Sequence, residues 1–248
     1  MASKFFAIVA GVGAGTGRSV ALRFAQAYPV VLLARKPESY TDIVAEISAA
    51  GGQAMGIAAD TSDTQAVASA LDEIKKLWGD KKLAAAIYNA SGGFSRKPFL
   101  ELTLDELDQS FAGSPRGLFN FSQAVLPFLL ASVPEPPPHG PPTLIITGAT
   151  ASVRGSARFA TFAAGKFAVR ALAQSLAREF GPQGVHVAHT IIDGVIDIPR
   201  TKGFNVNDGK PDGKISPDAI AENYWYLHRQ HRSSFTHELD LRPYVEQF

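Results

Sequence analysis

A glycine-rich run, Gly11–Gly17, follows the first apolar segment of the chain and precedes a segment with helical spacing. Glycines allow a backbone to approach a pyrophosphate closely, and the start of a helix offers it unpaired N–H groups and a partial positive charge. A strand, a glycine turn and a helix in this order are the context that a dinucleotide-binding motif needs. The candidate residues of the turn are Gly11, Gly13, Ala14, Gly15, Thr16, Gly17 and Arg18.

The residues after the second apolar segment indicate which dinucleotide fits. A protein that binds NAD tends to place an acid at this point for the ribose 2′-hydroxyl, whereas this chain has Arg35 and Lys36. An arginine can pair with a 2′-phosphate through two hydrogen bonds, and Arg18 is a second candidate for that role. We therefore expect NADP(H); the alternative is that Arg35 and Lys36 only solvate the end of a strand.

Short apolar runs alternate with longer amphipathic segments along the chain. Strands are expected at Phe5–Ala10, Val30–Ala34, Ala54–Ala59, Leu83–Asn89, Leu144–Thr147 and Val185–Ile192. Helices are expected at Gly15–Tyr28, Ser39–Ala50, Asp63–Leu77, Leu104–Ala131 and Phe159–Phe180, with Thr103 and Glu106 as a capping box before the fourth. Strands that are continuously apolar are typical of a parallel sheet covered on both faces. The pattern predicts one doubly wound α/β domain over residues 1–248, with helices on both faces of its sheet.

Two irregular segments interrupt this alternation. Val133–Pro142 contains six prolines in ten residues, so we expect an exposed loop there. The polar, glycine-containing segment Thr201–Lys214 follows the last expected strand. It predicts a substrate flap, of about residues 195–230 in all, beyond the end of the sheet where such folds bind ligands.

The composition excludes several classes of function. A net charge of +1 gives no electrostatic basis for binding nucleic acid or a membrane surface. The absence of cysteine excludes disulfides and thiolate metal sites, and it fits a reducing compartment, so a cytoplasmic location is expected. No segment approaches the roughly 18 consecutive apolar residues that span a bilayer.

The histidines do not indicate a metal site. His228 and His231 stand three residues apart on an expected helix, but no acid completes a ligand set, so a solvated helix face is expected. His186 and His189 lie on one expected strand, where residues three apart point to opposite faces and cannot share an ion.

These features together resemble the short-chain dehydrogenase/reductase family over nearly the whole chain. The resemblance implies a Rossmann-type fold, hydride transfer involving a nicotinamide cofactor and a small-molecule substrate, and a dimer or tetramer. It also implies that Asp60 contacts adenine, Lys166 holds the nicotinamide ribose and Ile196 faces the carboxamide. The matching positions are Gly11, Gly15 and Gly17 in the turn, Asp60 with Thr61, Asn89 and Ala90 with Ser91-Gly92, Lys166, and Gly194 followed by Val195 and Ile196.

The chain departs from the family pattern at its catalytic positions. Phe162 stands four residues before Lys166, where the family has tyrosine. Ala149 stands thirteen residues before Phe162, where the family has serine, and the family's asparagine falls on Ser114. Of the family's catalytic side chains, this interpretation retains only Lys166.

Without those groups, reduction of an ordinary ketone should be slow, because a general acid contributes on the order of 10²–10⁴ in rate. One solution is an iminium substrate, which needs no proton and can pack its charge against Phe162. Another is a different proton donor, for which Lys166, Ser152 and Tyr224 are candidates. A third is a non-redox cyclisation or isomerisation on the same fold.

We therefore expect an atypical NADP(H)-dependent oxidoreductase that acts on an activated C=N or C=O bond of a small molecule. The alternatives are a catalytically silent NADP(H)-binding protein and a non-redox cyclase or isomerase. Substrate specificity is expected in the loops Gly92–Leu100, Ser152–Arg158 and Thr201–Lys214, with Phe94 either lining the pocket or packing in the core. Candidate surfaces for subunit contact carry Phe111, Leu118, Phe121, Ala168, Leu172 and Leu176; the alternative is that these residues pack in the core.

Overall fold

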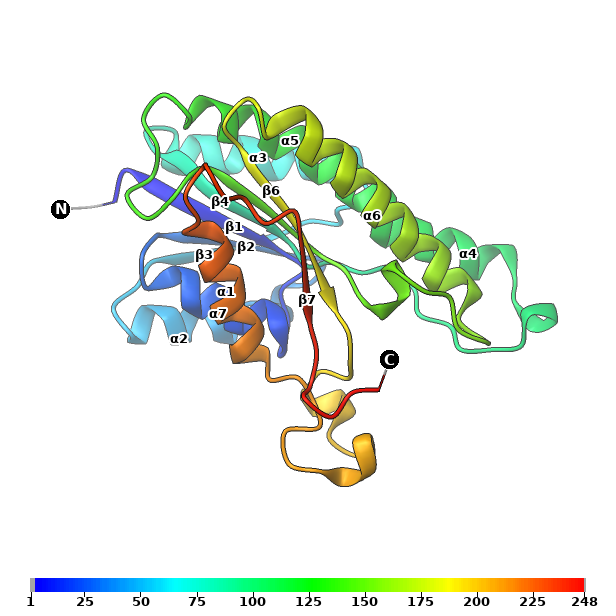
Figure 1. The fold of residues 1–248 in the computed structure, drawn as a ribbon. Coiled ribbons are helices and arrows are strands. Elements are labelled where there is room, and N and C mark those ends of the chain that lie inside the picture. The colour runs from blue at the N-terminus through cyan, green and yellow to red at the C-terminus, as the bar shows by residue number, and fades with distance from the viewer. Residues whose placement is uncertain (1–2, 248) are drawn as a thin grey trace.

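Seven parallel strands form one sheet in the computed structural model, which describes residues 3–247 (Figure 1). Their order across the sheet is β3-β2-β1-β4-β5-β6-β7. The strands are β1 (Phe5–Ala10), β2 (Val30–Ala34), β3 (Ala54–Ala58), β4 (Lys82–Tyr88), β5 (Thr143–Thr147), β6 (His186–Ile192) and β7 (Glu238–Leu241). The strand order reverses direction after β1, which confirms the predicted doubly wound fold.

Helices cover both faces of the sheet (Figure 1). One layer contains α3 (Thr64–Trp78), α4 (Leu104–Phe111), α5 (Gly117–Ala131) and α6 (Ala160–Phe180), and the other contains α1 (Thr16–Ala25), α2 (Thr41–Ala49) and α7 (Pro217–His228). Within β1, Phe6 and Ile8 pack into the core between the sheet and the layer of α3, α5 and α6. Ala7 and Val9 pack into the core between the sheet and the layer of α1, α2 and α7. Alternate side chains of a strand point to opposite faces, so a strand between two layers must be apolar throughout.

The predicted single helix Leu104–Ala131 is wrong, because the structure divides it. The chain forms α4, then a π-helical segment at Ala112–Arg116, and then α5. Pro115 lies inside the break and has no backbone N–H for helical hydrogen bonding. The predicted capping box is confirmed, because Thr103 Oγ1 accepts from Glu106 N at 3.2 Å and a Glu106 carboxylate oxygen accepts from Thr103 N at 3.0 Å.

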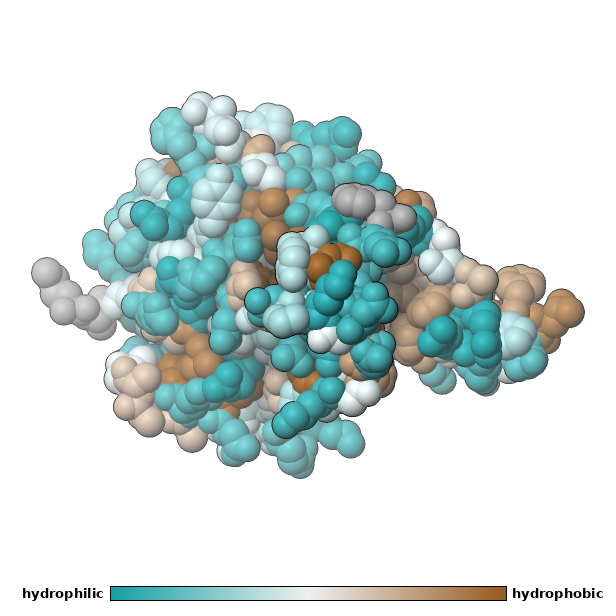
Figure 2. All heavy atoms as spheres, turned by 60° about the horizontal axis from the view of Figure 1, so that its bottom comes forward, coloured by the Kyte–Doolittle hydropathy of each residue, from teal (hydrophilic) through white to brown (hydrophobic). Residues whose placement is uncertain are grey.

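The segment between β4 and α4 extends away from the sheet (Figure 1). Apolar side chains gather at this projecting lobe in the space-filling view (Figure 2), and Phe99 and Leu100 are 74% and 97% exposed. The lobe therefore offers apolar surface near the carboxyl ends of the strands.

The segments after β6 only partly match the predicted flap. Residues 195–216 form an irregular excursion with two short 3-10 turns, Pro199–Thr201 and Asn207–Gly209. The remainder of the predicted range forms α7, which packs against α1 and buries Ile220 and Tyr224. The proline-rich residues 133–142 connect α5 to β5 without helix or strand, as predicted. Among the described residues, no helix has both the length and the apolar character that crossing a membrane would require.

Candidate functional site

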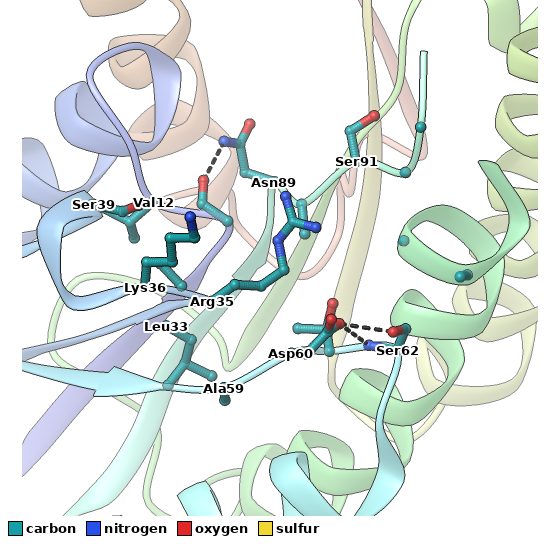
Figure 3. Close-up of a pocket in the computed structure, with 18 of the residues that line it drawn as sticks. Val12, Leu33, Arg35, Lys36, Ser39, Ala59, Asp60, Ser62, Asn89 and Ser91 are labelled. Atoms are coloured by element: carbon teal, nitrogen blue, oxygen red, sulfur yellow. Dashed lines mark hydrogen bonds between the residues drawn. The ribbon is translucent and has the colours of Figure 1, made fainter. Parts of the chain in front are cut away.

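A pocket of about 500 Å³ opens at the carboxyl ends of β1, β2, β3 and β4 (Figure 3). Open α/β sheets bind ligands at this edge. Six residues predicted to bind the cofactor line it: Gly11, Arg35, Asp60, Thr61, Asn89 and Ala90. The other lining residues are Val12, Leu33, Ala34, Lys36, Ser39, Ala59, Ser62, Ser91, Gly92, Gly93, Gln109, Ala112 and Gly113.

The glycine turn packs directly against the end of β4. Gly11 has φ +88°, and a Cβ at this position would lie 2.2 Å from the backbone nitrogen of Ala90. A Cβ at Gly17 would lie 2.6 Å from the carbonyl oxygen of Gly11. Asn89 closes the contact, because its side-chain amide donates to Gly11 O at 2.9 Å (Figure 3). Glycine is therefore required at positions 11 and 17 by the fold itself.

The start of α1 has the features of an anion site. The helix begins at Thr16 after Gly15, no side chain caps it, and its first turn contains no acid. Thr16 Oγ1 is buried and has no hydrogen-bond partner among residues 3–247. Free N–H groups, an unpartnered hydroxyl and the positive end of the helix dipole fit a phosphate group. Gly13, Ala14 and Gly15 are at least partly exposed beside it.

Two cations stand at the end of β2, on the rim of the pocket. Arg35 and Lys36 are exposed, line the pocket and have no ion pair within the described part of the chain (Figure 3). Asp60, after β3, is already engaged, because its Oδ1 accepts from Ser62 N at 2.9 Å and Ser62 Oγ at 2.8 Å. The arginine and lysine at this rim are therefore available to a ligand anion.

Arg18 does not join this cation pair, although the sequence made it a second candidate. Its guanidinium binds Glu46 of α2, with Nε donating to Oε2 at 2.9 Å and Nη2 donating to Oε1. It is not among the residues that line the pocket. An acid on a neighbouring helix competes for the arginine, and nothing near Arg18 in the sequence indicates that partner.

Lys166 lies within α6 and points toward the carboxyl end of β5. Its ammonium group donates to the carbonyl oxygen of Thr147 at 3.2 Å, and the residue is 5% exposed. Burial lowers the pKa of this lysine to about 8. Phe162, one turn earlier, has its ring centroid 6.0 Å from the ammonium nitrogen.

The other two donors considered from the sequence, Ser152 and Tyr224, make hydrogen bonds inside the protein. Ser152 is fully buried and its Oγ accepts from the backbone N–H of Ala149 at 3.0 Å. Tyr224 is fully buried and shares hydrogen bonds of 2.7 Å with Thr147 and Thr190. Burial raises the pKa of Tyr224 to about 12.

Ser114 is likewise held inside the π-helical segment. It is 1% exposed, and its Oγ accepts from the backbone N–H of Gly92 at 3.1 Å. Its hydroxyl therefore fixes the loop after β4. Of the three donors considered from the sequence, Ser152 and Tyr224 are fully buried, whereas Lys166 uses only one of its three N–H bonds for Thr147 O.

The segment after β6 meets the glycine turn through a residue that the sequence did not indicate. Gly194 and Ile196 do not line the pocket, and Ile196 forms an isolated parallel bridge with Ile215. Ile198 instead lies against Gly15, where a Cβ would come within 2.8 Å of its Cγ2. An apolar residue in a loop gives no sequence signal for such a contact.

Phe94 belongs to the surface, so its predicted alternative of core packing is wrong. The side chain is 59% exposed, and its ring meets the rings of Phe162 and Phe159 edge to face. These three phenylalanines, called the phenylalanine cluster below, lie beside Lys166. The sequence identified the four residues separately and could not show that they meet.

The histidines occupy separate structural positions. His228 ends α7 and is bound to Tyr28 at 2.9 Å and Thr143 at 3.0 Å, whereas His231 lies beyond the helix and contacts Ser233. They therefore do not form the solvated helix face that was expected, because His228 is buried. Within residues 3–247, no three His, Cys, Asp or Glu side chains group as metal ligands would.

His186 and His189 point to opposite faces of β6, as predicted. His186 contacts the carbonyl oxygen of Leu227, whereas His189 lies 3.4 Å from a carboxylate oxygen of Glu238, which also binds Arg170 of α6. Burial lowers the pKa of His189 to about 4, so this ring is neutral at physiological pH.

Comparison with known proteins places the chain in a family. A family model described as short chain dehydrogenase matches residues 6–207. A 1,6-dihydroxycyclohexa-2,4-diene-1-carboxylate dehydrogenase of Acinetobacter baylyi is 30% identical over 78% of this chain and 70% of its own length. A trihydroxynaphthalene reductase of Pestalotiopsis fici is 27% identical over 73% of this chain, a match that spans 61% of that protein.

Solved structures share the fold over its whole extent. A short-chain dehydrogenase from Rhodopseudomonas palustris is 32% identical and superposes with a TM-score of 0.80, covering 98% of this chain and 100% of that one. A metagenomic short-chain oxidoreductase in complex with NADP is 24% identical, with a TM-score of 0.79 over 98% of this chain and 99% of its own. At that identity the second similarity concerns the fold alone.

Proposed function

The chain belongs to the short-chain dehydrogenase family, and from that premise we propose that it is an NADP(H)-dependent reductase of a small molecule. The bond reduced is an activated C=O or C=N. The observation that carries the proposal is the pair Arg35 and Lys36, which have no ion pair within residues 3–247 and stand on the rim of the pocket that the glycine turn borders.

The proposed roles follow the positions of the residues. The turn residues Gly11, Gly13, Ala14, Gly15, Thr16 and Gly17 hold the pyrophosphate, while Asp60, Thr61, Asn89 and Ala90 border the adenosine half. Arg35 binds the 2′-phosphate through its planar guanidinium. Lys166 holds the nicotinamide ribose, and Gly194 and Ile196 border the nicotinamide. NADP(H), when bound, supplies the hydride.

Reduction of a carbonyl group also requires a side chain that donates a proton to the product oxygen. Phe162 and Ala149 have no acidic hydrogen, and the Ser114 hydroxyl is held by Gly92. Lys166 has a pKa of about 8, so its ammonium group can release a proton to an alkoxide near neutral pH. We propose Lys166 as the acid for carbonyl substrates, whereas an iminium substrate would need none.

A second candidate is a protein that binds NADP(H) without turnover. The observation in its favour is that the hydroxyls of Ser152 and Tyr224 are both fully buried, so neither is open to a substrate. This leaves proton transfer to one buried lysine. The two candidates make the same prediction for cofactor binding and opposite predictions for catalysis.

An oligomer is proposed as well, with a cytoplasmic location remaining a prediction. An apolar groove of about 610 Å³ runs between α5 and α6, and among the predicted contact residues Leu118, Leu172 and Leu176 line it. Exposed Phe119 borders the same groove. Leu118 and Phe121 are both fully buried in the core, so of the predicted contact residues that line the groove only Leu172 and Leu176 can meet a partner. A dimer or tetramer would cover this groove.

The test combines binding and turnover on the same preparation. NADPH and NADH are titrated against protein fluorescence, and NADPH oxidation is then followed with a panel of ketones and a panel of cyclic imines. Saturable NADPH binding that is tighter than NADH binding, with turnover of either panel, supports the reductase. Tight NADPH binding without any turnover supports the silent binder, and no saturable NADPH binding removes both.

A further inference from the structure

The phenylalanine cluster is fixed on one face of α6 beside Lys166. The ring centroid of Phe94 lies 5.2 Å from that of Phe162 and 5.8 Å from that of Phe159, at interplanar angles of 75° and 64°. Phe159, Phe162 and Lys166 follow one another at spacings of three and four residues, which places them on the same side of a helix. The cluster is therefore a continuous aromatic surface that ends at the lysine.

The loop that carries Phe94 is anchored at several points, although the ring itself is exposed. Before it, the backbone N–H groups of Gly92 and Gly93 donate to Ser114 Oγ at 3.1 Å and to Gln109 O at 3.1 Å. After it, Ser95 Oγ donates to Glu106 at 2.8 Å, and the backbone N–H of Lys97 donates to Arg158 O at 3.1 Å. A large ring held in place and 59% exposed is the kind of surface that binding partners use.

This surface adjoins the proposed cofactor pocket. Gly92 and Gly93 line that pocket, and Phe94 is the next residue in the chain. At the other end, Lys166 reaches the carboxyl end of β5 through Thr147. A substrate that lies against the cluster would therefore be next to the pocket rather than at a remote site.

The charges around the cluster are positive. The Arg96 guanidinium lies 5.5 Å from the Phe159 ring centroid and has no ion pair among the described residues, and neither has Arg158. Glu106 of α4, which accepts from Ser95 of this loop, is also bound to Lys97 at 2.7 Å, and the hydrogen bond from Lys97 lowers its pKa to about 2. Arg96, Arg158 and Lys166 together disfavour a cationic ligand and favour an anionic one.

We propose that Phe94, Phe159 and Phe162 form the wall of a substrate subsite for a planar aromatic ring that carries a negative charge, as in an aromatic carboxylate or a phenolate. The aromatic surface accepts the ring by edge and face contacts, and the exposed Arg96 guanidinium beside Phe159 pairs with the anionic group, while buried Lys166 adds positive charge next to Phe162. The inference deepens the proposed reductase function by naming its substrate class. Binding of an aromatic anion at the cluster does not depend on that function; only the identification of this ligand as the substrate rests on it. It also selects against the iminium ion considered from the sequence.

The test uses 2-naphthoate as the probe, titrated calorimetrically against the full chain with and without NADPH. Two matched ligands separate the contributions: the saturated decalin-2-carboxylate lacks the aromatic ring, and 2-naphthylmethylamine reverses the charge. We expect 2-naphthoate to bind at least about tenfold more tightly than either, and to bind more weakly as salt increases.

Substitutions at the phenylalanine cluster test whether 2-naphthoate binds there. Phe94→Ala should weaken 2-naphthoate about three- to tenfold, the equivalent of one aromatic contact. Phe99→Ala is the matched control, because Phe99 lies on the same lobe, is 74% exposed and has no ring contact with the cluster. Arg96→Gln should weaken 2-naphthoate and leave neutral 2-methoxynaphthalene unchanged. Arg229→Gln, at the end of α7, is its control.

The proposal is overturned if Phe94→Ala and Phe99→Ala change affinity equally, or if the cationic amine binds as tightly as the carboxylate. It is also overturned if no saturable 2-naphthoate binding occurs while NADPH binds normally, in which case the reductase proposal stands. If the chain does not bind NADPH but still binds 2-naphthoate, and Phe94→Ala weakens that binding, the cofactor assignment is rejected and the subsite proposal stands.

Discussion

The ammonium group of Lys166 lies 3.2 Å from the carbonyl oxygen of Thr147, at the carboxyl end of the interior strand β5. The contact joins a helix to the sheet edge where ligands bind in this fold. Burial is the cause of its lowered pKa of about 8, which is below the value of about 10 for an ordinary tyrosine. Lys166 is thus a stronger acid than the phenol it would replace.

The first prediction concerns the pH dependence of turnover. If Lys166 supplies the proton, the rate of carbonyl reduction should fall as the pH rises through about 8, because the lysine loses its proton there. Lys166→Met should remove most of this activity. The measurement is kcat between about pH 6 and pH 10; a profile that is flat over this range would contradict the assignment.

The second prediction concerns stability. The pKa of Lys166 falls from 10.5 to about 8 on folding, so between these values the unfolded chain binds more protons and stability rises with pH. At pH 7 the cost of burying the charge is fully present. Lys166→Met should therefore raise the free energy of unfolding at pH 7 by on the order of 1–3 kcal/mol. The gain should shrink toward zero near pH 10.5, measured by urea denaturation.

The exposed Lys76 of α3 provides the control for that experiment. Lys76→Met removes the same charge from solvent, so it should change the free energy of unfolding little at either pH. Equal effects of the two substitutions would show that burial of Lys166 is not the cause.

The third prediction concerns cofactor preference. Arg35→Ala should weaken NADPH binding about 10- to 100-fold and leave NADH binding nearly unchanged, because a charge-assisted contact to the 2′-phosphate is lost. Arg18→Ala is the matched control, since Arg18 is bound to Glu46 and should have less than about a threefold effect. Fluorescence titration measures both; an unchanged preference after Arg35→Ala would reject the role.

The fourth prediction compares two glycines of one turn. Gly11→Ala places a methyl group 2.2 Å from Ala90 N at a positive φ, and it should lower the free energy of unfolding by about 2–4 kcal/mol. Gly13→Ala meets no atom within 4 Å and should stay within about 0.5 kcal/mol of the parent chain. Urea denaturation measures the difference, and similar losses for both would contradict the packing argument.

The fifth prediction introduces a phenol at position 162, where the family pattern has tyrosine. Phe162→Tyr with Ala149→Ser places a phenol one helical turn from Lys166 and adds the serine of the family pattern, and ketone reduction should rise at least about tenfold. Turnover of an iminium substrate should not rise, since no proton is needed. Phe167→Tyr, at an exposed position of the same helix, is the control and should have no effect. An equal response from both aromatic positions would argue against the lost proton relay.

Local patterns in the sequence determined the sheet and the candidate cofactor pocket. Continuous apolar runs such as Phe5–Ala10 are required for strands between two helical layers, so their positions could be predicted closely. The turn Gly11–Gly17 and the cations at Arg35 and Lys36 could be predicted because each follows a strand directly. Strand ends in a parallel sheet share one edge, which brings these residues together without further information.

Contacts between distant segments were decided only by the tertiary structure. Glu46 takes Arg18 away from the pocket, and the π-helical break at Pro115 divides a segment with continuous apolar spacing. Phe94 joins Phe162 across 68 positions of chain in an aromatic contact. The burial that shifts the pKa of Lys166 depends on the layers packed around it. The physical reason is that backbone preferences act over a few neighbouring residues, whereas burial, ion pairing and ring contacts depend on which segments the folded chain brings together.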